Sequence, residues 1–386
     1  MPAPRRLLTI GHSYCVELNR RLPQELARNG TWEVTAVAPA RWRGDFGWHA
    51  TAAGAAEACR VVPVPVRFSR RIHTMLFGAD VARLLRQPWD LVHCWEEPYV
   101  ASAAQIARAT APRVPLVFAT FQNIVKRYPP PFNWIERSAR QRADGMIAFG
   151  ETARQVLEAR GWAQPARTIP PGVDVDCFRP DRDQGRQLRH QLGWADDVPV
   201  VGFVGRFVPE KGLRLLMEAL DRLDRPWRAL FVGSGPLEGE LRAWANRDGT
   251  RVRVSSGVAH HAVPAYLNAM DVLCAPSQTT ARWREQFGRM LIEAFACGVP
   301  VIASTSGEIP HVVADSGLTV GEHDREGWVH AIGQLLSDPS RRAHLAQRGR
   351  ERAVSTYAWR IVAGRHLDFF SELIGRATGA QRTPRI

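Results

Sequence analysis

The segment Arg284–Ser304, REQFGRMLIEAFACGVPVIAS, decides the fold of the second half of this chain. The regular apolar spacing from Phe287 onward predicts a helix, the glycine and proline of ACGVP end it, and VIAS predicts the buried strand that follows. Glu285 and Glu293 stand in this stretch, Glu285 just ahead of the helix. On a helix their spacing corresponds to about 12 Å along the axis. The pair therefore predicts contacts to two ends of one elongated ligand.

Alternation of strands and helices extends outward from this segment through both halves of the chain. Apolar runs that predict strands, with helical patterns between them, lie at 6–13, 32–39, 90–95, 115–121 and 145–150 in the first half and at 198–207, 228–235, 252–258, 271–277 and 299–305 in the second. Such alternation implies right-handed crossovers and mostly parallel sheets. We expect an α/β protein with two doubly wound, Rossmann-like domains facing an interdomain cleft.

The pattern is interrupted at 168–187, a stretch rich in proline and polar residues. This composition predicts a domain boundary. We expect an N-terminal domain over residues 1–178 and a C-terminal domain over residues 179–365, with a C-terminal helix at about 366–386 that rejoins the first domain.

Composition narrows the classes of partner and location. The formal net charge of +13 favours an acidic partner such as nucleic acid, a phospholipid surface or a phosphorylated ligand, but 49 of the 51 cationic residues are arginines, and this bias in composition can account for the charge by itself. We expect no nucleic-acid partner. The six cysteines show no CxxC spacing, which argues against a zinc site. The N-terminal apolar run is too short for a signal peptide, so we expect a cytoplasmic location. Only Lys126 and Lys211 are lysines, which draws attention to both.

The glycine-rich turns of the second half indicate a phosphate site. VGSGPLEGE approaches a dinucleotide fingerprint, but its third glycine, Gly239, comes one position late, which disfavours a nicotinamide enzyme. In VGFVGRFVPEKG, Arg206 and Lys211 follow a predicted strand and precede a helix, an arrangement that suits a diphosphate. Backbone N–H groups at the start of the helix after Phe287 would add to it, and Glu293 can accept from ribose hydroxyls.

Four segments in this order, GRFVPEKG, VGSGPLEGEL, AVPAYLNAMDVLCAPS and EQFGRMLIEAFACGVPVIAS, resemble the C-terminal half of the retaining glycosyltransferases of family 4, which have the GT-B fold. The resemblance covers roughly residues 170 to 320. It implies three catalytic residues, which are Arg206, Lys211 and Glu285, the last holding the hydroxyls of the donor sugar. It also implies a set that binds the rest of the donor, namely Gly205, Val258, Phe287, Gly288, Arg289 and Glu293.

The first half departs from the pattern of that family. Its first turn is GHSY, with Gly11 as its only glycine, and Gln122 and Trp95 stand where the family often has histidines. Strand ends and one loop still supply candidates for the acceptor or sugar side, which are Gly11, His12, His93, Glu96, Gln122, Asn123 and Lys126. A capping or structural role is an equal alternative for several of them.

These observations together predict a metal-independent, retaining hexosyltransferase of polysaccharide biosynthesis or a related pathway, with a nucleoside diphosphate sugar of the UDP or GDP type as donor and no further cofactor. A cell-surface glycan, a lipid-linked glycan or a small molecule remains open as acceptor. The alternatives are a GT-B sugar-nucleotide epimerase and an inactive sugar-nucleotide-binding scaffold.

The basic, amphipathic stretch 68–89 allows two interpretations. It can lie at the surface of an anionic membrane as a peripheral contact, or it can be a helix packed on the core. The apolar residues within it favour the second.

Overall fold

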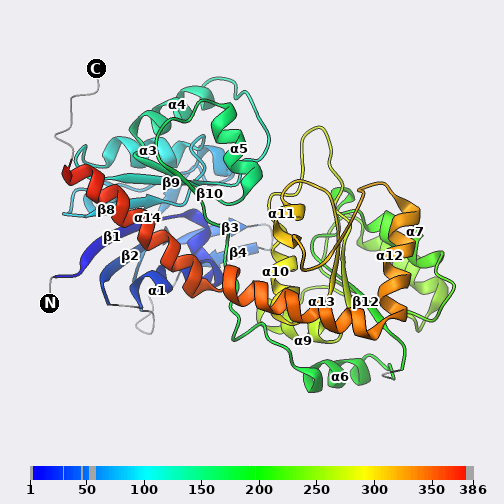
Figure 1. Ribbon diagram of the computed structural model, residues 1–386. Helices are drawn as coiled ribbons and strands as arrows, with labels where there is room; N and C mark the ends of the chain where they lie inside the picture. The colour runs from blue at the N-terminus through cyan, green and yellow to red at the C-terminus, as the bar shows by residue number, and fades with distance from the viewer. Residues whose placement is uncertain (1–2, 29, 45–46, 52–57, 196, 380–386) are drawn as a thin grey trace. The chain divides into compact units, whose positions relative to one another are not determined.

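The computed structural model describes residues 3–28, 30–44, 47–51, 58–195 and 197–379 (Figure 1). The chain forms two compact units. Unit 1 runs to Pro170 and takes in the chain again from Trp359, and unit 2 is Pro171–Ala358.

Both crossings between the units come earlier in the chain than the composition suggests. The first lies at Pro170 and not near residue 178, because Phe178 is buried in unit 2, where its ring lies 5.2 Å from that of His260. The chain returns at Trp359 and not near residue 366, because Trp359 and Val362 belong to the apolar core of unit 1. Proline content indicates the region in which the chain crosses between the units, whereas the burial of Phe178 and Trp359 shows to which unit each segment belongs.

Unit 1 is built on a seven-stranded parallel sheet in the order β11-β10-β9-β8-β1-β2-β5. Its strands are β1 (Arg5–Ile10), β2 (Trp32–Pro39), β5 (Arg60–Val64), β8 (Leu91–Cys94), β9 (Leu116–Thr120), β10 (Gly145–Ala148) and β11 (Ala166–Thr168). Two short antiparallel pairs, β3 (Arg41–Gly44) with β4 (Gly47–Ala50) and β6 (Val66–Arg67) with β7 (Leu76–Phe77), lie outside this sheet.

Helices of unit 1 pack around this sheet. They are α1 (Arg21–Ala27), α2 (Asp80–Leu85), α3 (Ala101–Ala109), α4 (Phe132–Arg142), α5 (Glu151–Ala159) and the C-terminal α14 (Trp359–Gly379). Helix α14, red in Figure 1, packs beside α1 and buries Phe369 and Phe370 among residues of β1 and β2. The end of the chain therefore completes the core of its first unit, as expected for the C-terminal helix.

Unit 2 contains a six-stranded parallel sheet in the order β14-β13-β12-β15-β16-β17. Its strands are β12 (Val200–Val204), β13 (Arg228–Val232), β14 (Val252–Ser255), β15 (Val272–Ala275), β16 (Val301–Ser304) and β17 (Leu318–Val320). Its helices are α6 (Arg182–Gln191), α7 (Leu213–Asp221), α8 (Glu238–Ala245), α9 (Val263–Asn268), α10 (Arg289–Ala296), α11 (Ile309–Val313), α12 (Arg325–Ser337) and α13 (Pro339–Arg352).

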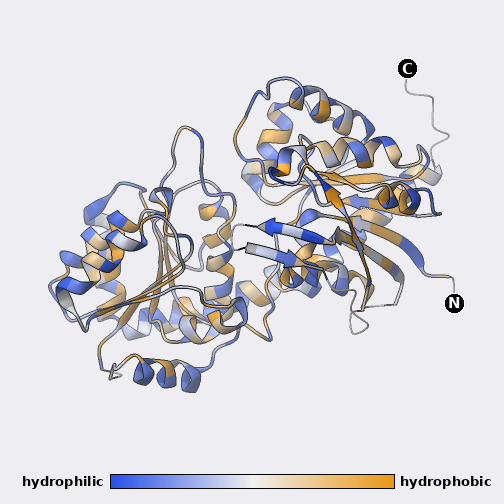
Figure 2. Cartoon of the chain, turned by 180° about the vertical axis from the view of Figure 1, so that it is seen from behind, coloured by the Kyte–Doolittle hydropathy of each residue, from blue (hydrophilic) through white to orange (hydrophobic). Residues whose placement is uncertain are grey.

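The strands of both sheets carry apolar side chains on both faces, as Figure 2 shows by their mostly orange colour. Every residue of β8, β9, β10, β15 and β16 is buried. Continuous apolar strands of this kind are typical of parallel sheets covered by helices on both sides. The predicted fold class, two Rossmann-like α/β domains, is confirmed.

Strand order reverses once in each unit. In unit 2, β13 and β14 extend the sheet to one side of β12, and the chain then returns to place β15 on the other side. In unit 1, β2 and β5 lie on one side of β1 and β8 on the other. Loops that leave the two central strands at such a point diverge, which opens a crevice at their carboxyl ends.

In unit 2 the two loops at this point touch through a glycine. Gly212 follows a short 3-10 turn, Pro209–Lys211, and adopts a left-handed conformation with φ of +70°. A Cβ atom at Gly212 would lie 1.8 Å from the carbonyl oxygen of Pro276, just after β15. Nearby, the N–H of Gln278 donates to the carbonyl of Glu210 at 2.8 Å. Only glycine fits here without strain.

We expect Gly212→Ala to lower the free energy of unfolding by at least about 1 kcal/mol, since alanine disfavours this φ and its methyl group would meet Pro276. Gly239→Ala is the matched control, because a Cβ at Gly239 in α8 meets no atom within 4 Å. Urea unfolding would compare the two variants. Equal stability of both would contradict the close approach of Gly212 to Pro276.

Candidate functional site

The carboxyl ends of β12 and β15 bring together residues that lie far apart in the sequence. Lys211, on the loop after β12, forms an ion pair with Glu285, on the loop after β15. The side chains of Lys211 and Glu285 are 12% and 8% exposed. Ser277 Oγ donates to Glu285 Oε2 at 2.9 Å, and the ammonium of Lys211 lies 5.3 Å from the ring centre of Trp283. Two buried charges are thus compensated within one cluster.

The backbone around Glu285 is also held in place. Its carbonyl accepts from the N–H of Glu308 at 3.0 Å, and its N–H donates to Ser306 Oγ at 3.3 Å. Gly307 approaches so closely that a Cβ there would lie 2.0 Å from the Glu285 carbonyl oxygen. The carboxylate of Glu285 therefore sits on a backbone fixed by the loop that follows β16.

The loop after β12 packs on the loop after β13. The N–H of Gly205 donates to the carbonyl of Val232 at 2.9 Å, and that of Phe207 donates to the carbonyl of Ser234 at 2.8 Å. A Cβ at Gly233 would lie 1.8 Å from the carbonyl oxygen of Gly205, which accounts for a glycine at that position. Arg206, between the two bonded residues, has an exposed side chain.

Helix α10 begins one turn after Glu285. Gly288 is its N-cap with φ of +83°, and among the described residues no side chain caps it. The first N–H groups of a helix that lacks such a cap are suited to an anion. Phe287, just before the cap, is buried, and its ring lies 5.9 Å from that of Tyr357.

Glu293 lies in the second turn of α10 and is buried. Its Oε1 is 3.1 Å from Nε2 of His260, and the ring of His260 packs against Phe178. Val258 is half-buried on the same loop after β14. Glu293 on α10 is therefore in contact with His260 on the loop after β14, the loop that also carries Val258.

Two features of this arrangement differ from what the sequence suggests. Because Glu285 precedes α10, helical rise does not set its distance from Glu293, and the roughly 12 Å expected along a helix axis does not describe the separation of the two carboxylates. Glu285 and Lys211, expected to act on different groups of the ligand, bind each other. Sequence reasoning also missed Ser277, Trp283 and His260; position near Glu285 or Val258 was the only available signal for them.

Unit 1 has a polar cluster at its own point of reversal, between β1 and β8. Gly11 follows β1, and the next residue, His12, lies 2.7 Å from Glu96 Oε2 through its Nδ1. The N–H of His12 also donates to Glu96 Oε1 at 2.5 Å. Burial lowers the pKa of His12, but the charge and hydrogen bonds of Glu96 outweigh burial, so the pKa is raised. Glu96 is buried and holds His12 at two points, the ring nitrogen Nδ1 and the backbone N–H.

Glu97 lies beside this pair and accepts two hydrogen bonds of 2.7 Å, from Thr120 Oγ1 and from the N–H of Phe121. Burial nevertheless raises the pKa of Glu97 to about 7. A carboxyl group with so high a pKa at a strand end is typical of functional sites.

His93 is fully buried in unit 1, which favours a structural role over contact with a ligand. Its side chain points from β8 into the apolar core, where its ring lies 5.4 Å from Phe370 and 5.9 Å from His366. Burial, with a contribution from His366, holds the pKa of His93 well below its ordinary value. His93 Nδ1 lies 3.1 Å from Thr9 Oγ1, so His93 is a structural residue.

The loop after β9 carries the remaining candidates of unit 1. Gln122 Nε2 donates to Tyr128 Oη at 2.6 Å, and the Tyr128 ring stacks on Tyr99 at 4.4 Å. Asn123 is buried and Lys126 is exposed. Gln122 therefore holds the loop in place with its amide and lies one strand away from the His12–Glu96 pair.

The raised pKa of Glu97 has a consequence for stability. Between pH 4.5 and about 7 the folded state keeps a proton that the unfolded chain releases, so the free energy of unfolding falls as pH rises through this range. We expect Glu97→Gln to remove this component, so that its stability falls less than that of the wild type between pH 5 and pH 7.5. Urea unfolding across the range would show it. Glu17→Gln, at an exposed position, should follow the wild type; parallel curves for all three would contradict the assignment.

Two family models match the chain, one in each unit. "Glycosyltransferase Family 4" matches residues 18–177, and "Glycosyl transferases group 1" matches residues 185–352. Among curated proteins, the GDP-mannose-dependent alpha-(1-6)-phosphatidylinositol monomannoside mannosyltransferase of Mycolicibacterium smegmatis is 35% identical over 57% of this chain and 60% of its own length. The D-inositol 3-phosphate glycosyltransferase of Xylanimonas cellulosilytica is 34% identical over 54% of this chain and 51% of its own length. The chain thus matches between about half and three fifths of the length of these relatives.

Solved structures match over nearly the whole chain. Sucrose-phosphate synthase from Thermosynechococcus elongatus has a TM-score of 0.73 at 21% identity, over 96% of this chain and 100% of the other. HepE from Anabaena, solved in complex with UDP, has a TM-score of 0.73 at 19% identity, over 95% and 100%. These similarities establish the fold as GT-B. With one family model on each unit, the chain belongs to the GT-B glycosyltransferases of group 1 and family 4.

Proposed function

We propose that this chain is a retaining glycosyltransferase that moves a sugar from a nucleoside diphosphate donor to an acceptor hydroxyl. The observation that carries the proposal is the buried Lys211–Glu285 pair at the carboxyl ends of β12 and β15, beside the start of α10. A cation, a carboxylate and a helix N-terminus in one crevice match the diphosphate and sugar of such a donor.

Each group of the donor has a partner in this proposal. The ammonium of Lys211 has three N–H donors, and the pair with Glu285 uses one, so the others can meet diphosphate oxygens. Arg206 adds a planar guanidinium, and the N–H groups at Gly288 and Arg289 add a helix end. The second oxygen of Glu285 accepts from sugar hydroxyls, and Glu293 accepts from the ribose.

Departure of the diphosphate is the step that these cations assist. Negative charge grows on the leaving oxygens as the glycosidic bond breaks, and in our proposal Arg206 and Lys211 stabilise this charge without a metal ion. Glu285 is held by Lys211 and Ser277, which suits a hydroxyl acceptor better than a nucleophile. We therefore infer attack from the face that the diphosphate leaves, with retention at the anomeric carbon.

The identity of the donor and the acceptor is the least constrained component of the proposal. One relative is named for GDP-mannose, and HepE was solved with UDP and with UDP-glucose, so the donor base is uracil or guanine in our proposal. A glycan, a lipid-linked glycan or a small polyol can serve as acceptor. In unit 1 the candidate contact for the acceptor is the imidazole of His12, which Glu96 holds through Nδ1.

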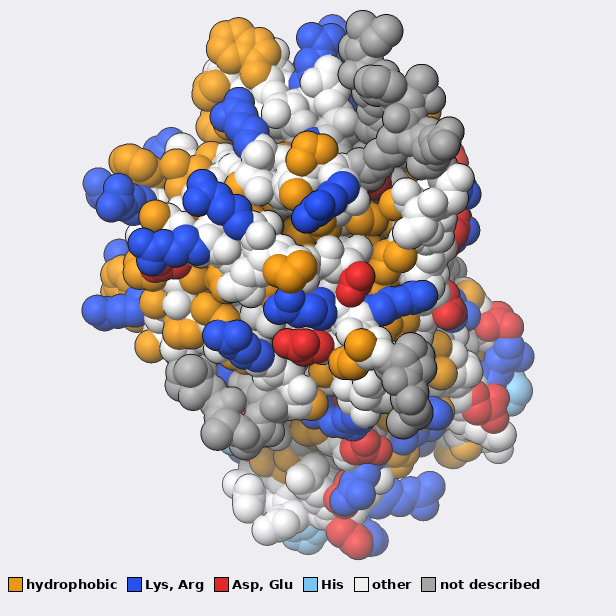
Figure 3. Space-filling model, turned by 90° about the vertical axis from the view of Figure 1, so that its left-hand side faces the viewer, with side chains coloured by type: hydrophobic (Ala, Val, Ile, Leu, Met, Phe, Trp, Pro, Cys, Tyr) orange, Lys and Arg blue, Asp and Glu red, His pale blue; other side chains and the backbone are white. Residues whose placement is uncertain are grey.

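A cytoplasmic location with peripheral contact to an anionic membrane completes the proposal. The stretch 68–89 does not form one amphipathic helix: it contains a 3-10 turn, β7 and α2, and it buries Met75 and Phe77. Phe68 remains 68% exposed beside the exposed Arg70 and Arg71. In Figure 3 basic side chains are scattered over the face shown, among hydrophobic, acidic and uncharged polar ones. Within the described residues, no helix has the length and hydropathy of a membrane span.

Loss of the diphosphate contacts should abolish most of the turnover. We expect Lys211→Ala and Arg206→Ala each to lower kcat by a factor of about 100 or more, the usual cost of one preorganised group that stabilises developing charge. Arg214→Ala is the control, because Arg214 is exposed on α7 and pairs with Glu240. Release of nucleoside diphosphate from a panel of UDP and GDP sugars, with acceptor, would be measured. Activity near that of the control in either variant would refute the diphosphate assignment.

The stereochemistry and the absence of a metal requirement can be tested in one assay. Proton NMR of the first product should show the anomeric configuration of the donor sugar, and EDTA should leave the rate unchanged. Inversion, or a loss of activity that Mg²⁺ restores, would overturn these parts of the proposal. Formation of an epimer from donor alone would indicate the epimerase alternative. Saturable donor binding without turnover would indicate a scaffold.

A further inference from the structure

Unit 2 contains a second cavity, of about 690 Å³, at the amino ends of the strands, opposite the candidate site. Met270 and Asp271 directly precede β15, Val299 and Pro300 directly precede β16, and all four line the cavity. Because the strands are parallel, the residues proposed to bind the sugar-nucleotide donor, which follow the carboxyl ends of the strands, lie at the opposite end of the sheet. The volume is within the range of small-molecule sites.

Arginine dominates the polar lining of this cavity. Five guanidinium groups line it, those of Arg182, Arg186, Arg189, Arg342 and Arg350. The first three come from α6 and the last two from α13. Two carboxylates also line it, those of Asp181 and Asp271. Met270 and Val299, both buried, provide an apolar floor.

Carboxylates neutralise only part of this positive charge. Arg189 pairs with Asp271 at 2.7 Å, and Arg186 pairs with Asp183 at 2.6 Å. The carboxylate of Asp181 accepts from the N–H of Gln184 at 2.9 Å and so caps α6.

The other guanidinium groups have neutral partners or none that is described. Arg342 donates to the carbonyls of Leu335 and Leu336, and Arg350 to that of Ala296, all near helix C-termini. These contacts fix the two side chains, and no carboxylate of the described residues forms an ion pair with either of them. Arg182 is exposed and has no hydrogen bond or ion pair within the described part of the chain.

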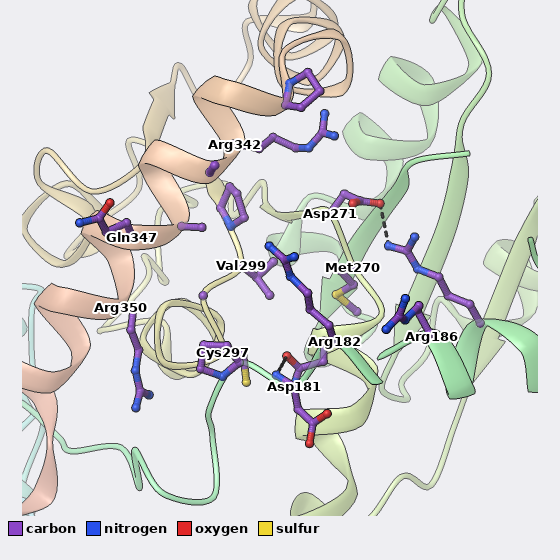
Figure 4. A pocket seen from close by; sticks show the side chains of 18 residues that line it. Asp181, Arg182, Arg186, Met270, Asp271, Cys297, Val299, Arg342, Gln347 and Arg350 are labelled. Carbon is purple, nitrogen blue, oxygen red and sulfur yellow. Dashed lines mark hydrogen bonds and ion pairs between the residues drawn. The ribbon is translucent and has the colours of Figure 1, made fainter. Parts of the chain in front are cut away.

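Two of these groups converge on the same space. Figure 4 shows Arg182 reaching from α6 toward Val299 and Met270, and Arg342 reaching from α13 toward Asp271. Both enter the cavity from opposite walls. A planar guanidinium offers paired N–H donors that match phosphate oxygens.

We propose that this cavity binds a small organic phosphate, distinct from the sugar-nucleotide donor. Its phosphate group, with a charge near −2 at neutral pH, would lie between Arg182 and Arg342. Its organic part would cover Met270 and Val299. A soluble phosphate ester and the headgroup of a phospholipid share this chemistry, and the test below separates them. The proposal does not depend on the donor assignment, because no lining residue belongs to the candidate site.

Isothermal calorimetry with glycerol 3-phosphate tests the proposal on the whole chain. We expect saturable binding by the wild type, and Arg182→Gln should weaken it about tenfold, the cost of one charge-assisted contact. Arg222→Gln is the matched control, since Arg222 is an exposed arginine of unit 2 that pairs with Glu326 away from the cavity. The exposed position of Arg182 makes a folding defect unexpected, and equal melting temperatures of the unliganded variants would verify this.

Three results would overturn the proposal, and one comparison identifies the source of the phosphate. The proposal fails if neither millimolar glycerol 3-phosphate nor the vesicles described next bind the protein, if Arg222→Gln weakens binding as much as Arg182→Gln, or if Lys211→Ala removes binding while Arg182→Gln preserves it. Phosphatidylcholine vesicles with phosphatidic acid provide the second arm. Cosedimentation that depends on Arg182 supports the proposal with a lipid source, whereas calorimetric binding that depends on Arg182 supports it with a soluble source.

Discussion

The reversal of strand order beside β12 is the constraint on which the candidate site depends. Because β15 returns to the free side of β12, the loops that follow these two strands leave from adjacent points. Lys211 on one loop and Glu285 on the other can then meet, and the contact of Gly212 with Pro276 holds the loops at that distance. The ion pair satisfies two charges that burial would otherwise penalise. The reversal of strand order thus determines where in the sheet the candidate site lies.

Most of unit 2 could be predicted from sequence, since its strands are short apolar runs and its turns carry glycines. Lys211, Glu285 and Glu293 stand next to such turns and apolar runs, so the sequence predicts each of them individually as a site residue. Their partners were not, because a pair such as Lys211–Glu285 is formed by the three-dimensional return of the chain and leaves no local signal. His260 illustrates the limit: nothing in VAHHAV distinguishes the histidine that meets Glu293 from its neighbour.

In unit 1 the sequence located the strand ends but could not tell which way each side chain points. His93 and Glu96 are three positions apart, yet His93 faces the core and Glu96 meets His12 at the end of the sheet. A strand alternates its side chains, and the last residues of the strand and the turn after it break that alternation. Whether His93 lies inside or outside depended on α14, whose Phe370 and His366 surround it from 270 positions or more along the chain.

Helix α10 connects the two sites of unit 2. It starts at Gly288, beside Lys211 and Glu285, and it ends at the second cavity, where Arg350 donates to the carbonyl of Ala296 and Cys297 lines the wall. A ligand that draws on the cavity arginines acts on groups that hold one end of this helix, while a donor phosphate acts on the other. If the two ligands bind with a coupling free energy, each must change the affinity of the other by the same factor. A rigid helix of eight residues, with Glu293 in its middle, is a short physical route for such coupling.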